Sequence, residues 1–335
     1  MTEATLKRLF GYQSAFDHPV TRWATVAVVG GLVVSVIAVR LLFHFRRIDR
    51  KLYDEILLRW KSWLWLVVLM LGPILLGAAW VMAAVAVLSL LCFREYARAT
   101  GLFREKTICA VVVLGIVVVT FAVIDHFDRL FFSTAALTTG LIAIVTIPQD
   151  RPKGYIQRVA LGVLGFVLFG YSFGYLGFIA NEAKYRPILV MTLLGVEMND
   201  VFAFCVGKTL GGPRLVPNTS SGKTVAGSVG ALVLTTVLVG GLGHVIFEGT
   251  PMDRLDRLML LGGGLSALGQ LGDLLLSSIK RDVGLKDMGV TIPGHGGLLD
   301  RFDSLVLVPP ALLHYLSLHL GPLGSGQAER ILSGG

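Results

Sequence analysis

The side chains with the clearest chemical potential lie in one polar stretch, residues 277–304 of a 335-residue chain. Acidic and basic side chains alternate there around the glycine-rich run 293–297. Carboxylates bind hard cations such as Mg²⁺, which usually also grip substrate phosphates. Lysine and arginine neutralise phosphoryl oxygens, and glycines let backbone N–H groups approach a phosphate closely. The stretch therefore predicts a metal–polyphosphate site, with these charged members: Asp282, Asp287, Asp300, Asp303, Lys280, Arg281, Lys286 and Arg301.

Two further carboxylates stand in apolar surroundings. Asp273 lies in an otherwise apolar helix, and a charge within a membrane span costs at least about 2.5–3.5 kcal/mol, so it usually lines a functional cavity. The plainer interpretation of Asp273 is an aspartate at a helix end that reaches water. Asn199 and Asp200 follow another apolar run. They are candidates for a polar cavity wall, and a structural hydrogen bond between helices explains them equally well.

A second polar loop covers residues 208–224. Ser220, Lys223 and Thr224 combine hydroxyls with a lysine near an expected helix start, an arrangement that can bind a phosphate. The run is not a P-loop, because Pro217 stands where that motif needs its first glycine. Attraction of a basic loop to an anionic lipid leaflet is the competing interpretation.

The elements that must position these residues are membrane helices. Of the chain, 54% is hydrophobic and only 16% charged, with 40 glycines, which excludes an ordinary soluble domain. We predict an all-α, polytopic transmembrane bundle of nine or ten spans. Apolar runs occur at 24–43, 62–95, 107–124, 129–147, 158–180, 186–207, 225–247, 256–279 and 302–320, with 62–95 broken into two near Gly72-Pro73 and Gly77.

Charge placement predicts the orientation. About two thirds of the 30 lysines and arginines fall in alternate loops, which the positive-inside rule places in the cytosol of a bacterial-type inner membrane. The net charge of +8 then reflects loops facing an anionic leaflet, with no nucleic acid partner. The three cysteines lack metal or disulfide spacing. We divide the chain into N-terminal helices (1–155), a catalytic membrane region (156–320) and a tail (321–335).

The polar stretch resembles the signature of the phosphatidate cytidylyltransferases, or CDP-diacylglycerol synthases. The likeness lies in Ser277-x-Ile279-Lys280-Arg281, Lys286-Asp287-x-Gly289 and the run from Ile292 to Asp303. A weaker likeness extends over about 185–320. The resemblance implies an enzyme that condenses CTP with phosphatidate in the membrane to give CDP-diacylglycerol and pyrophosphate, using Mg²⁺ with or without a second cation.

By the same resemblance, Asp273 and Asp300 are the principal metal carboxylates, with Asp287 and Asp303 close by. Five residues would hold phosphates: Lys280, Arg281, Lys286, His295 and Arg301. For His295, a metal ligand and an acid–base group stay open beside the preferred role of phosphate donor. Ser220, Lys223, Thr224, Gly294, Gly296 and Gly297 would bind the nucleotide or its phosphates.

One loop departs from the family pattern Ser-Pro-x-Lys-Thr-x-Glu-Gly. Ser221 replaces the proline and Ala226 the glutamate. This departure keeps an alternative open, a CTP-dependent paralogue acting on another lipid acceptor, such as a polyprenol kinase. A transporter is the third hypothesis, because buried charges also mark ion paths, but no repeated halves support it. The oligomeric state stays open, a homodimer being one option.

Overall fold

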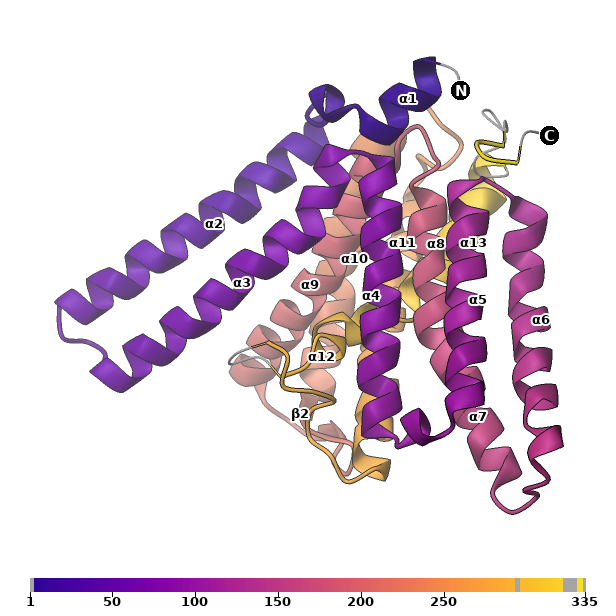
Figure 1. Ribbon diagram of the computed structural model, residues 1–335. Coiled ribbons are helices and arrows are strands. Elements are labelled where there is room, and N and C mark those ends of the chain that lie inside the picture. Colours follow the sequence, from indigo (N-terminus) through magenta and orange to yellow (C-terminus); the bar gives the residue numbers. More distant parts are fainter. Residues whose placement is uncertain (1–2, 293–295, 322–329, 334–335) are drawn as a thin grey trace.

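The computed structural model describes residues 3–292, 296–321 and 330–333 and is a bundle of helices (Figure 1). Among the described residues, nine helices are long and apolar enough to cross a membrane. The prediction of an all-α membrane bundle is therefore confirmed. The helices are α1 (Glu3–Phe10), α2 (Pro19–His44), α3 (Arg50–Leu76), α4 (Ala78–Ala99), α5 (Lys106–Ile124), α6 (Asp128–Val145), α7 (Tyr155–Gly165), α8 (Ser172–Ile179), α9 (Tyr185–Leu210), α10 (Val225–Phe247), α11 (Leu255–Asp282), α12 (Leu299–Phe302) and α13 (Val308–Leu320).

Short elements complete the fold. A π-helical segment, Phe166–Tyr171, joins α7 to α8 into one span, Tyr155–Ile179. The loop before α10 forms an antiparallel hairpin of β1 (Arg214–Val216) and β2 (Ser220–Thr224). In the part of the chain that the structure describes, 3₁₀ turns lie at Tyr12–Ser14, Leu102–Arg104, Ile147–Gln149 and Asp303–Leu305.

The long apolar run 62–95 is broken only at Gly77, and Pro73 stays inside α3. Gly77 has φ +144°, and a Cβ atom there would lie 2.2 Å from the carbonyl oxygen of Leu9. Only glycine fits such a contact, so the chain turns where α1 crosses it. The predicted division of this run into two helices is therefore confirmed at Gly77. A break at Gly72-Pro73 was wrong, because a membrane helix tolerates proline when neighbouring groups take up the freed backbone partner.

The predicted last span, 302–320, is also not one helix. α12 ends at Phe302, a 3₁₀ turn covers Asp303–Leu305, and α13 has only 13 residues. Pro309 and Pro310 stand in the first turn of α13, where a helix needs no N–H donor. The irregular backbone places Asp300 and Asp303 on a sharp turn inside the bundle.

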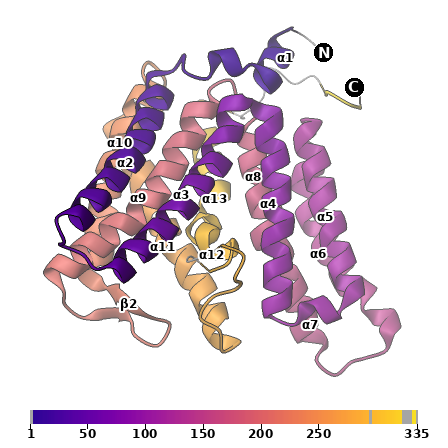
Figure 2. The ribbon, with the colours of Figure 1, turned by 60° about the vertical axis from the view of Figure 1, so that its left-hand side comes forward.

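The basic loops gather at one end of the bundle. Figures 1 and 2 show the hairpin, the α4–α5 and α6–α7 connections and the segment after α11 at that end, while both termini lie at the other. This alternation is the one predicted from the charges. Which side of a membrane the basic end faces remains a prediction.

Helices α2 and α3 form a slanted pair that leans away from α4 (Figure 2). They pack on α9, and α3 meets α4 at the end that carries the termini. Arg186 of α9 fixes this junction, since its guanidinium donates to the carbonyl oxygens of Ile74 (3.2 Å), Ser14 (3.4 Å) and Gly11 (2.8 Å). The core behind them consists of α4, α5, α8, α9 and α11.

Candidate active site

Four separate segments bring charged side chains together at the basic end of the bundle: β2, α9, α11 and the turn around α12. Lys280 of α11 lies 3.0 Å from Asp300 Oδ1 and 3.6 Å from Asp303 Oδ2. All three side chains are nearly buried, at 10%, 3% and 12% exposure. A buried ammonium between two carboxylates is an ion-pair network whose members depend on one another.

Asp300 also organises the backbone around it. Its second oxygen, Oδ2, accepts hydrogen bonds from the backbone N–H groups of Met288 (2.8 Å) and Gly297 (3.0 Å). Asp300 therefore holds Lys280 and both ends of the segment 288–297, which is called the glycine-rich loop below. The predicted residues Gly294 and His295, which belong to this loop, lie outside the described residues.

A second carboxylate that the sequence reasoning missed holds the same loop. Glu95, near the end of α4 and 9% exposed, accepts hydrogen bonds from Leu298 N (3.0 Å), Leu299 N (2.8 Å) and Thr291 Oγ1 (2.5 Å). The one signal in the sequence is an acidic residue among the basic residues that end an apolar helix. Its partners lie about 200 positions away, so spacing could not reveal them.

The hairpin contributes Lys223 to the site. Its ammonium lies 2.5 Å from Asp273 Oδ2 of α11, and Asp273 Oδ1 accepts from Ser277 at 3.1 Å. Thr224 caps α10, because its hydroxyl accepts the N–H of Gly227 at 3.0 Å. This cap fixes where the hairpin ends, and so helps to point Lys223 at Asp273.

Asp200 of α9 also lies at the charged site. Its carboxylate accepts from the Ser304 hydroxyl at 3.0 Å and lies within electrostatic range of Asp273, Lys223 and Arg301. Arg301 has a buried Nε that finds no hydrogen-bond partner among the described residues. Such a donor is costly to bury unpaired, so it marks a place for an acceptor such as a phosphate oxygen.

Other predicted residues are placed differently. Arg281 donates to the backbone carbonyls of Thr219 (3.3 Å) and Leu285 (3.1 Å), tying the hairpin to α11. Asn199 is buried and accepts from Thr235 (3.2 Å) and Ser266 (2.6 Å), which is an interhelical hydrogen-bond set. Ser220 pairs with Val216 in the hairpin. Lys286 and Asp287 are exposed, and Gly296 packs beside Asp287.

The carboxylates offer a divalent cation only part of a coordination shell. Across the described ranges, no three His, Cys, Asp or Glu side chains are arranged to hold a metal ion. Asp300 already accepts from three donors, whereas Asp273 and Asp303 lie close enough to repel each other. Mg²⁺ commonly uses one or two carboxylates together with substrate phosphates. The donor set fits that mode, with Asp273 and either Asp200 or Asp303, and does not fit a dedicated protein cage.

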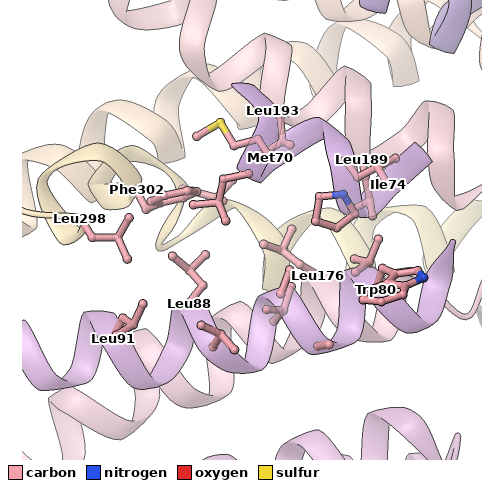
Figure 3. Close-up of a pocket in the computed structure, with 18 residues that line it drawn as sticks. Met70, Ile74, Trp80, Leu88, Leu91, Leu176, Leu189, Leu193, Leu298 and Phe302 are labelled. Carbon is pink, nitrogen blue, oxygen red and sulfur yellow. The ribbon is translucent and has the colours of Figure 1, made fainter. Parts of the chain in front are cut away.

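An apolar cavity of about 330 Å³ reaches the turn around α12, where Leu298, Phe302 and Leu305 line it. It runs between α3 and α4 and is closed by α8 and α9 (Figure 3). Leu298 and Phe302, on either side of Asp300 and Arg301, form its inner end, and Trp80 lies toward the other (Figure 3). A second, mostly apolar cavity of about 500 Å³ lies between α2, α3 and α9 and has Glu197 in its lining. It shares Met70 and Leu193 with the first.

Fold and site together define an integral membrane protein that places buried charges beside two mostly apolar cavities. Comparison with known proteins narrows this class. Residues 57–319 match the cytidylyltransferase family, and the chain belongs to that family. It is therefore a nucleotidyltransferase of the membrane, whose family uses a nucleotide and a lipid.

Individual relatives differ in how much of the chain they match. The uncharacterized protein YnbB of Escherichia coli K12 is 28% identical over 285 residues, 82% of this chain and 91% of that protein. The phosphatidate cytidylyltransferase of Rickettsia bellii is 32% identical over 161 residues, 47% of this chain and 70% of that enzyme. The Bacillus subtilis phosphatidate cytidylyltransferase is 38% identical over 163 residues, 48% and 60% of the two chains.

Proposed function

We propose that this protein is a phosphatidate cytidylyltransferase, which converts CTP and phosphatidate to CDP-diacylglycerol and pyrophosphate. One observation carries the proposal: the turn around α12 contributes side chains both to the charged site and to the first apolar cavity. Asp300 forms an ion pair with Lys280, whereas Leu298 and Phe302 line one end of the apolar cavity. A lipid phosphate whose chains fill that cavity would meet the charged site, where the nucleotide triphosphate binds.

The chemistry needs little covalent help from the protein. An ionised oxygen of the phosphatidate phosphate attacks the α-phosphorus of CTP and forms a new P–O bond. The bond to the β-phosphate oxygen breaks, and pyrophosphate leaves with the electron pair. Because the attacking oxygen is already ionised, no general base is required, and catalysis rests on alignment and on charge stabilisation.

The residues divide this work by position. Lys223, Lys280 and Arg301 supply the positive charge that faces the phosphates. Mg²⁺, held by Asp273 with Asp200 or Asp303, would add charge neutralisation at the triphosphate. Asp300 keeps Lys280 and the glycine-rich loop in place.

Apolar volume on both sides of α3 suits an acceptor with two chains. The two cavities share Met70 and Leu193, so two acyl chains can lie on either side of that contact. A polyprenol kinase would need room for one chain only. We further propose that the charged site faces the cytosol, where CTP is available, in a bacterial-type inner membrane.

The test uses purified full-length protein in detergent with Mg²⁺, phosphatidate and CTP labelled at either the α- or the γ-phosphate. We expect α-label in the lipid extract, none from the γ-position, and one pyrophosphate released per labelled lipid. Asp273→Asn should lower the rate at least about 100-fold, the size of effect seen when one electrostatic partner of a transition state is lost. Asp54→Asn, at a 61%-exposed side chain, is the matched control.

Three results would overturn the proposal. One is a folded sample that leaves the lipid unlabelled. Another is γ-label in a lipid acceptor, which identifies a kinase. The third is equal turnover of lysophosphatidate and phosphatidate, which contradicts the use of both cavities.

A further inference from the structure

We infer that Glu95 is a positioning residue of the active site, which holds Thr291 and the start of α12, Leu298 and Leu299, against α4. The inference rests on the proposed function for its kinetic test. Its structural test is independent of that function. None of the motif residues lies on α4, so this role enlarges the site beyond the signature stretch.

The carboxylate of Glu95 accepts hydrogen bonds from three groups of the segment 291–299. Both carboxylate oxygens are used, because Leu298 N–H and the Thr291 hydroxyl donate to Oε1 and Leu299 N–H donates to Oε2. Glu95 forms no ion pair with any residue in the described part of the chain. A buried carboxylate whose described partners are backbone and hydroxyl donors is fully committed to orienting those groups.

Glycines in the loop match this carboxylate closely. A Cβ atom at Gly297 would lie 2.6 Å from Glu95 Oε2, and one at Gly289 would lie 3.0 Å from Oε1. Both glycines therefore lie against the carboxylate, and a Cβ atom at Gly297 would also come within 2.9 Å of the backbone nitrogen of Gly289. Gly297, which was expected to serve phosphate binding, thus also lies at the Glu95 contact.

Two carboxylates, those of Asp300 and Glu95, hold the loop through hydrogen bonds. Asp300 holds Met288 and Gly297 from within α12, and Glu95 holds Leu298 and Leu299 from α4. Leu298 also lines the apolar cavity, together with Leu91, one helical turn before Glu95. Glu95 therefore sets how far the lipid end of the site stands from the Lys280–Asp300 pair.

The sharpest perturbation is Glu95→Gln, which keeps the shape and replaces one acceptor oxygen by an NH₂ donor. That donor would face an N–H or O–H donor whichever way the amide turns. Glu55→Gln, at a 52%-exposed side chain of α3, makes the same chemical change away from the loop. Glu95→Asp keeps the charge and shortens the reach.

The first measurement is hydrogen exchange of the loop amides by mass spectrometry, on full-length protein in detergent. We expect Glu95→Gln to speed exchange in the 288–300 peptides at least tenfold, Glu95→Asp to do so less, and Glu55→Gln to leave it unchanged. The second is kinetics with CTP and phosphatidate. Glu95→Gln should raise KM for CTP at least fivefold and lower kcat at least tenfold.

Unchanged loop exchange in Glu95→Gln would overturn the inference, whatever the enzyme's reaction proves to be. A lower kcat with no change in KM for CTP would also overturn it, since a smaller active fraction explains that pattern. If the wild-type protein transfers no cytidylyl group, the exchange result alone decides, and the failure belongs to the proposed function instead.

Discussion

Removal of the Lys280 ammonium should be among the most destabilising single changes in the basic half of the bundle. Lys280→Met leaves Asp300 and Asp303, 3% and 12% exposed, without the cation that lies 3.0 and 3.6 Å from them. Stranding one member of a buried pair costs about 3–5 kcal/mol, whereas an exposed pair contributes about 0–1 kcal/mol. We therefore expect a loss of about 3–5 kcal/mol in unfolding free energy, roughly a hundredfold to several thousandfold in the equilibrium constant.

The assay is equilibrium unfolding in mixed micelles with a rising fraction of sodium dodecyl sulfate, followed by circular dichroism. The double variant Lys280→Met/Asp300→Asn removes one stranded charge, so it should recover at least about 1 kcal/mol relative to Lys280→Met. Lys153→Met, at an exposed lysine of the α6–α7 loop, is the control. A loss under about 1 kcal/mol for Lys280→Met, or a double variant as unstable as the summed single variants, would refute the buried-pair reasoning.

Three further predictions concern other parts of the fold. Asn199→Leu removes the acceptor of two interhelical hydrogen bonds, so it should cost about 1–2 kcal/mol in the same unfolding assay. Thr224→Ala removes the α10 cap and should cost about 1 kcal/mol, whereas Thr224→Ser should cost little; a comparable loss in both variants would contradict capping. Asp125 is buried, which opposes its charge, but hydrogen bonds from Ser333 and Leu332 outweigh this and lower its pKa. A carboxyl group whose pKa is lowered by folding stabilises the folded state above its unfolded-state pKa, and that stabilisation is lost as pH falls through the folded-state pKa. Measured relative to the intrinsic exchange rate at each pH, exchange of the Leu332 and Ser333 amides should therefore accelerate in acid below about pH 4, and Asp125→Asn should accelerate it already at neutral pH.

The charged core of the site was predictable because charges are scarce in this chain. A carboxylate such as Asp273 or Asp300 is costly to bury in an apolar membrane protein, so its presence in an apolar stretch already indicates a functional site. The structure brings both together with lysines, Lys223 and Lys280. Their individual roles in metal and nucleotide binding stay predictions.

Glu95 could not be found in the same way. It stands beside Arg94 near the end of α4, where an acidic residue normally reaches water at a membrane interface. Its burial depends on a loop about 200 residues later that folds over it. No periodicity or spacing within α4 carries that information, because the cause is a tertiary contact.

Helix boundaries were predicted only in part, for a related reason: of the two expected breaks, Gly77 is confirmed and Gly72-Pro73 is not. Pro73 is the stronger local breaker, yet the helix continues through it and stops at Gly77, where α1 crosses. The irregular turn between α12 and α13 likewise follows from the ion pairs of Asp300 and Asp303, which hydropathy averages over 302–320 cannot register.

The junction at Gly77 fixes one end of the long helix α3, so a small tilt there displaces the other end. α3 has 27 residues and so measures about 40 Å, and a tilt of about 5° at its fixed end would swing the far end by about 3 Å. The cavity between α3 and α4 would widen or narrow accordingly. Arg186 and α1 hold that junction. Because bilayer thickness alters helix tilt, a change in the membrane would alter the gap between α3 and α4 through the junction at the end of the bundle opposite the charged site.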